Sequence, residues 1–197
     1  MMPISRHEMY GKAKAGSVAG IAGGVALLAS FFGIDSSLNL SPGSFYMMMG
    51  LAVGFHGIPA ILFGSIVHMV TAATIGAVFC MCSVLHPALY LRSTWKGVFA
   101  GGVTGLEVYA IFFMPITLYL MIPALYAATS SAVSGQEYLA VSVLKAHLGT
   151  IIWGALILHV LYGAVMGFFS GTILHKDYKK IPKKSLYELE SESMPAT

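Results

Sequence analysis

The sequence has very little charge for its length. Only 19 of its 197 residues are charged, or 10%, whereas a soluble domain carries about 25%. Four of the charges lie in residues 1–14 and nine in residues 176–197, which leaves six for the 161 residues between. This shortage excludes a soluble globular domain, a coiled coil and a disordered chain. The net charge of +3 is too small for a nucleic-acid-binding surface, so no nucleic-acid partner is expected.

Cysteines and catalytic motifs are also scarce. The two cysteines, Cys80 and Cys82, lie in an apolar run, which excludes a disulfide framework. The sequence contains no phosphate-binding loop, dinucleotide-binding fingerprint, nucleophile elbow or zinc-protease motif. It therefore identifies no catalytic residue, and it assigns no cofactor.

What the sequence does contain is long apolar stretches, with 57% hydrophobic residues overall. About 20 apolar residues cross a bilayer core some 30 Å thick. We therefore expect an all-α, multi-pass protein in the lipid bilayer of the plasma membrane. A shorter apolar run, residues 45–55, is followed by glycine and proline and predicts an interfacial or re-entrant helix. The four predicted transmembrane helices are about 15–34, 59–85, 97–122 and 148–174.

The positions of the basic residues predict an orientation. With four spans, the N-terminus, the loop near residues 89–96 and the tail share one side, and that side holds ten of the eleven Lys and Arg residues. Only Lys145 falls on the other side. Because basic loops stay in the cytoplasm, residues 1–14 and the tail, 176–197, are both predicted to be cytoplasmic. The ten residues are Arg6, Lys12, Lys14, Arg92, Lys96, Lys176, Lys179, Lys180, Lys183 and Lys184.

The two halves of the chain resemble each other. Residues 15–89 and 90–175 each contain a glycine-rich helix followed by a helix with an internal histidine, which predicts a tandem repeat of two-helix units. The glycines are four apart on one face, a spacing that lets helices approach closely, within the bundle or against a partner subunit. The matched glycines are Gly16, Gly20 and Gly24 with Gly97, Gly101 and Gly105, and His56, His68 and Gly76 match His147, His159 and Gly167.

Three ionisable residues lie near the predicted membrane midplane, on three different helices: His68, Glu107 and His159. A carboxylate in hydrocarbon is costly, so Glu107 is expected to face the bundle interior and to have a partner. The position that matches Glu107 in the first unit is Ala26, so the carboxylate breaks the repeat. This midplane cluster could be a hydrogen-bonded packing element, a metal or haem site, or a path for protons or a substrate.

A second, weaker metal candidate lies on the outer side. Two histidines there begin the second helix of each unit, and a methionine run lies nearby. Histidine with methionine can bind Cu(I), although water can satisfy an interfacial histidine and methionine often only fills a core. These residues are His56, His147, Met47, Met48 and Met49.

The run from His159 to Gly167, His-Val-Leu-Tyr-Gly-Ala-Val-Met-Gly, resembles a stretch in small uncharacterised four-span membrane proteins of prokaryotes. More loosely, the size, the Lys-rich then acidic tail and the lack of a catalytic motif resemble accessory subunits of archaeal ammonia monooxygenase, a membrane copper enzyme. Neither resemblance transfers site residues.

The leading functional hypothesis is a non-catalytic structural or accessory subunit that binds other membrane-protein subunits. The alternatives are a small transporter or channel with a path through the midplane cluster, and a protein that binds copper, another metal or haem.

Overall fold

A computed structural model describes residues 6–130 and 135–179, and within these residues it contains helices and no strand. Four segments are long and apolar enough to cross a membrane: Glu8–Ser37, Gly57–Cys82, Thr94–Ala128 and Leu148–His175. The all-α class and the four predicted spans are therefore confirmed. The elements are α1 (Arg6–Ser37), α2 (Ser44–Leu51), α3 (Gly57–Cys82), η1 (Pro87–Leu89), α4 (Thr94–Val108), η2 (Tyr109–Phe113), α5 (Met114–Ile116), η3 (Thr117–Met121), α6 (Ile122–Ser130), α7 (Gly135–Ala146) and α8 (Leu148–Lys179).

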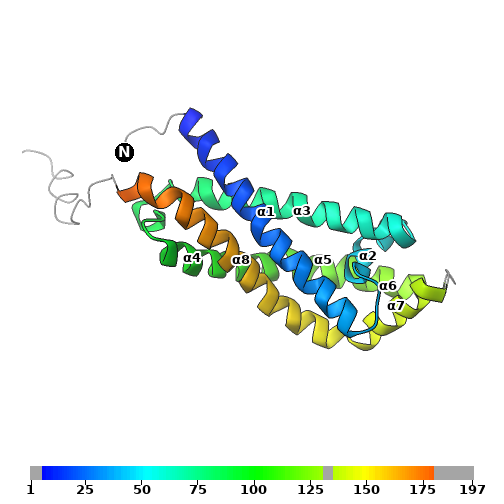
Figure 1. Cartoon of the computed structure of the whole chain (residues 1–197). Coiled ribbons are helices and arrows are strands. Elements are labelled where there is room, and N and C mark those ends of the chain that lie inside the picture. The colour runs from blue at the N-terminus through cyan, green and yellow to red at the C-terminus, as the bar shows by residue number, and fades with distance from the viewer. Residues whose placement is uncertain (1–5, 131–134, 180–197) are drawn as a thin grey trace, which may run out of the picture.

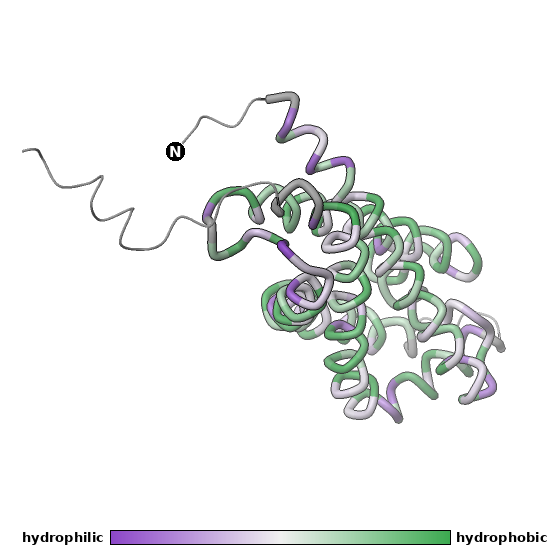
Figure 2. Tube along the Cα trace, turned by 60° about the vertical axis from the view of Figure 1, so that its left-hand side comes forward, coloured by the Kyte–Doolittle hydropathy of each residue, from purple (hydrophilic) through white to green (hydrophobic). Residues whose placement is uncertain are grey.

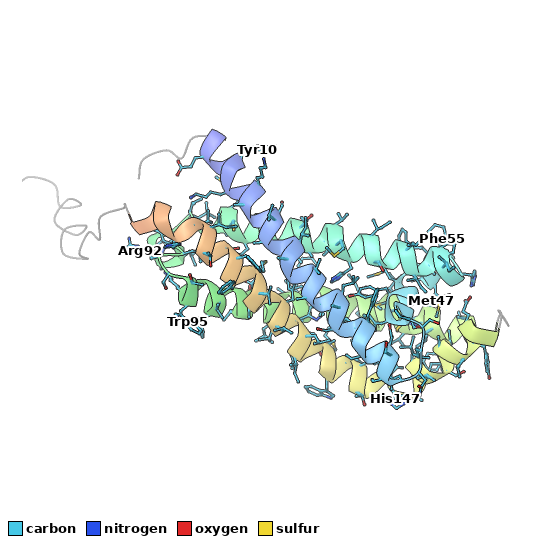
Figure 3. The ribbon with its side chains drawn as sticks, in the orientation of Figure 1. Tyr10, Met47, Phe55, Arg92, Trp95 and His147 are labelled. Carbon is cyan, nitrogen blue, oxygen red and sulfur yellow. The ribbon has the colours of Figure 1, made fainter. Side chains whose placement is uncertain are left out.

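The four long helices are neighbours in the order α3, α1, α8, α4. Helix α1 begins and α8 ends at one end of the bundle, here called the terminal end, and the other end is called the far end (Figure 1). Arg92 and Trp95 lie at the terminal end, whereas Phe55 and His147 lie at the far end (Figure 3). This arrangement separates Arg92 and Lys96, which follow η1, from Lys145, as the sequence predicts. Lys180, Lys183 and Lys184 of the predicted tail lie outside the described residues.

Glycines hold α1 against α3. A Cβ added to Gly16 would lie 2.1 Å from the carbonyl oxygen of Gly76. One added to Gly20 would lie 2.2 Å from the carbonyl oxygen of Ala72. Both distances are far below van der Waals contact, so only hydrogen fits between these backbones. The predicted glycine face of the first helix therefore packs inside the bundle.

The pair α4 and α8 repeats this contact. A Cβ on Gly97 would lie 2.2 Å from the carbonyl oxygen of Gly167, and one on Gly101 would lie 2.1 Å from that of Gly163. The pairs Gly97–Gly167 and Gly16–Gly76 consist of positions that the sequence repeat matches. The equivalent contacts agree with a duplicated two-helix unit, which stays a prediction.

The third span is longer than predicted. Pro115 and Pro123 both lie within it, and the helix continues past them to Ala128. Two π-helical segments, η2 and η3, precede the two prolines. A proline lacks the N–H that an α-helix needs at that place, and a wider turn accommodates the missing bond without ending the helix. The structure also adds α7, which was not predicted.

The short helix α2 packs inside the protein, with seven of its eight residues buried. Gly43, with φ of 93°, turns the chain into it. The buried carboxylate of Asp35, 1% exposed, accepts the Gly43 N–H at 2.8 Å. This negative charge also complements the positive end of the α2 dipole. Helix α2 contacts α3 closely, which favours the re-entrant form of the prediction over the interfacial one.

The outer surface of the bundle suits lipid. Apolar residues cover the long helices, and polar residues gather mostly toward the ends (Figure 2). Trp95 is 82% exposed near the start of α4, and Trp153 is 70% exposed near the start of α8, which lies at the far end. Tryptophans are enriched at membrane–water interfaces. Their positions agree with a bundle that crosses the bilayer along its length.

The glycine contacts predict a difference between two substitutions in α8. Gly167→Ala places a Cβ 2.0 Å from the Gly97 carbonyl oxygen, so the helices must separate. We expect a loss of about 1–3 kcal/mol and a lower melting temperature of the purified protein in detergent. Gly154→Ala is the control, because no atom lies within 4 Å of its added Cβ. Equal effects of the two substitutions would contradict this packing.

Candidate functional site

His68 of α3 and His159 of α8 line the same cavity, which has a volume of about 180 Å³. His159 is 8% exposed, and its ring centre lies 4.8 Å from that of Phe113. The cavity wall is otherwise mainly apolar and aromatic, and no Asp, Glu, Lys or Arg among the described residues lines it. The structure thus brings two of the three predicted midplane residues together.

Backbone carbonyls determine where each imidazole carries its proton. His68 Nε2 lies 3.1 Å from the carbonyl oxygen of Gly24, and His159 Nδ1 lies 2.7 Å from that of Ala155. A carbonyl oxygen only accepts hydrogen bonds, so both nitrogens must donate. In the neutral rings, Nδ1 of His68 and Nε2 of His159 therefore keep their lone pairs. The cavity is lined by two residues that can each accept one more hydrogen bond.

Glu107 differs from its expectation. It is exposed on the protein surface and lines a groove of about 460 Å³ between α3 and α4. Thr71, Thr74 and Thr104 also line this groove, and the rest of its wall is mainly apolar. No hydrogen bond or ion pair of Glu107 is found within residues 6–130 and 135–179. The predicted convergence of three residues therefore holds for the two histidines, and Glu107 lies in an adjoining groove.

Tyr46 of α2 is a cavity residue that the sequence did not identify. It lines the cavity, and its ring centre lies 5.1 Å from that of His68. Its hydroxyl is buried and has no hydrogen-bond partner in the described part of the chain. Burial, together with the Asp35 carboxylate, raises the pKa of Tyr46, so the hydroxyl stays protonated and can donate. The sequence did not indicate this role, because Tyr46 lies outside the four predicted spans. The packing of α2 against α3 brings Tyr46 to the cavity.

The outer metal candidate does not form one site. Met47 and Met48 are buried in the core, whereas Met49 lines the cavity with His68. His56 lines a different opening from His147. The candidate set His56, His147, Met47, Met48 and Met49 is therefore dispersed.

His56 instead has a carboxylate partner. Its Nδ1 lies 2.9 Å from Oε1 of Glu137, and Glu137 Oε2 also accepts the Gly57 N–H at 3.2 Å. Glu137 lies in the first turn of α7, an element that was not predicted. One indication in the sequence that Glu137 has a role is that few charged residues lie between the two termini.

The cavity does not suit haem. Its volume of about 180 Å³ is close to that of an engineered cavity that accommodates benzene, whereas a porphyrin contains four pyrrole rings. Among the described residues, no three His, Cys, Asp or Glu side chains lie close enough to hold a metal ion. What the site offers is hydrogen bonding inside an aromatic cavity.

The hydrogen bonds to Gly24 and Ala155 predict opposite tautomers for the two histidines. In ¹⁵N spectra of labelled protein we expect a protonated Nε2 and an unprotonated Nδ1 for His68. For His159 we expect the reverse. A doubly protonated ring at neutral pH, or the same tautomer in both residues, would show that these carbonyls do not control the rings.

Comparisons of the chain with models of protein families, with curated proteins and with solved structures found no match. The resemblances to four-span prokaryotic proteins and to ammonia monooxygenase subunits thus stay expectations. The function has to be argued from the geometry of the groove and the cavity.

Proposed function

We propose that this protein is a non-catalytic subunit of a larger membrane complex, and that a transmembrane helix of a partner subunit packs in the groove between α3 and α4. The observation that carries this proposal is the exposed carboxyl group of Glu107 in that groove. The proposal deepens the leading hypothesis from the sequence by giving the partner a place.

Glu107 lies within the membrane by its position in the third span. It is about 20 Å along the helix from Thr94 at a rise of 1.5 Å per residue, and the span continues to Ala128. A carboxyl group at this depth is costly unless it has a hydrogen-bonding partner. Because the described residues of this chain supply none, the partner helix does.

The groove also specifies the chemistry of that helix. Its wall is mainly apolar, with Thr71, Thr74 and Thr104 near the carboxyl group. An apolar helix with one Lys, Arg or His at the level of Glu107 complements both features. The charge of Glu107 then selects the register of the contact.

The transport alternative has one observation in its favour, since the groove and the histidine cavity share Thr71, Val108 and Phe112 in their walls. However, a path for ions needs a succession of polar groups, and both walls are mainly apolar. The subunit role therefore has the stronger support.

Orientation and context complete the proposal. The terminal end, which carries Lys12, Lys14, Arg92 and Lys96, faces the cytoplasm in the plasma membrane, following the positive-inside rule. The resemblance to accessory subunits of archaeal ammonia monooxygenase supports a membrane-bound copper monooxygenase as the setting.

Site-specific photocrosslinking in the native membrane tests the partner helix. A benzoylphenylalanine at Thr104 or Val78, both in the groove wall, should crosslink to one defined protein. At Phe99, which is 77% exposed and outside the groove, it should react mainly with lipid. Glu107→Leu should lower the groove crosslink several-fold, because the partner's donor loses its acceptor.

Val103→Leu is the control for Glu107→Leu, since Val103 is exposed on the same helix and does not line the groove. It should leave the crosslink unchanged. If the groove positions react only with lipid, or if the protein migrates alone after gentle extraction, the subunit proposal is wrong.

A further inference from the structure

We infer that the cavity between His68 and His159 binds the uncharged, hydroxylated aromatic ring of a lipid-soluble molecule, with a quinol head group as its type. The inference depends on the cavity alone and not on the partner helix proposed for the groove.

The size of the cavity selects a single substituted ring. An engineered cavity of about 150 Å³ holds one benzene molecule, and this cavity measures about 180 Å³. A lone metal ion would leave most of it empty, and an acyl chain would need a longer space. Three rings of the wall suit a flat aromatic guest. Phe31 and Phe45 are stacked 3.9 Å apart, and Phe113 is stacked 6.5 Å from Phe45.

The hydrogen-bonding groups select hydroxyls on that ring. Nδ1 of His68 and Nε2 of His159 hold lone pairs, because the other nitrogen of each ring donates to a carbonyl. A guest with two O–H groups satisfies both acceptors. A quinone, which has carbonyls only, leaves both histidines without a donor.

The charge and the opening of the cavity select a guest from the bilayer. No charged side chain of the described residues lines the wall, so a charged guest would lack a counterion. Phe112, Ile116 and Leu120 line the cavity and are also exposed on the lipid-facing surface. The cavity thus opens sideways into the hydrocarbon region. It lies on the far-end side of Glu107, so a helix that packs on Glu107 need not cover the opening.

Three probes of nearly the same shape test the inference on the purified full chain in detergent, without oxygen. Duroquinol donates two hydrogen bonds, whereas duroquinone and the dimethyl ether of duroquinol donate none. We expect saturable binding of duroquinol by calorimetry, and binding of the other two that is weaker by about tenfold. Duroquinol should also shift the ¹⁵N signals of His68 Nδ1 and His159 Nε2.

The variant His159→Phe keeps a ring but removes one acceptor, so it should reduce the preference for duroquinol over its ether. The control is His175→Phe, because His175 lies at the terminal end of α8 and does not line the cavity. It should keep the full preference. Equal affinity of the wild-type protein for all three probes, or no saturable binding, would overturn the inference even if the variant fails to fold.

Discussion

The close approach of backbones at glycines is the contact on which the rest of the structure depends. It joins α1 to α3 and α4 to α8, with carbonyl oxygens where side chains would otherwise stand. The two pairs then meet through α1 and α8. The Tyr162 hydroxyl of α8 also reaches the other pair, where it donates to the Ala72 carbonyl oxygen of α3 at 3.1 Å. Because each outer helix already has its partner, α3 and α4 remain apart. The groove and the opening of the cavity both follow from that separation.

Polar groups in this protein are mostly satisfied by backbone nearby. Asp35 accepts from the start of α2, Glu137 from the start of α3, and the rings of His68 and His159 donate to carbonyls. In an apolar surrounding this is the arrangement with the lowest free energy, because each unpaired group costs more there than in water. What remains unsatisfied is therefore informative. The exposed carboxyl group of Glu107 is the basis of the proposed partner helix, whereas the histidine lone pairs are the basis of the proposed small ligand.

The long elements could be predicted because hydrophobic length is a local property of the sequence. The four spans, the short helix near residue 45 and the glycine faces are all recognisable without tertiary information. The predicted end of the third span was wrong. A proline ends a helix only when nothing accommodates its missing N–H, and here the π-helical segments η2 and η3 accommodate it. Helix α7 was missed because its moderate polarity resembles that of a loop. The predicted surroundings of Glu107 were wrong for another reason. The depth of a residue along a helix follows from its position in the sequence, but which face of the helix meets a neighbour depends on which helices touch.

The sequence by itself determined the membrane class, the number of spans and the separation of basic residues between the two ends, because each follows from composition along a single helix. The tertiary structure alone decided that His68 and His159 share a cavity, that Tyr46 joins them, and that Glu107 stands outside in a groove. These relations depend on the order in which the helices pack. That order is decided by contacts between residues far apart in the chain, which no local pattern records.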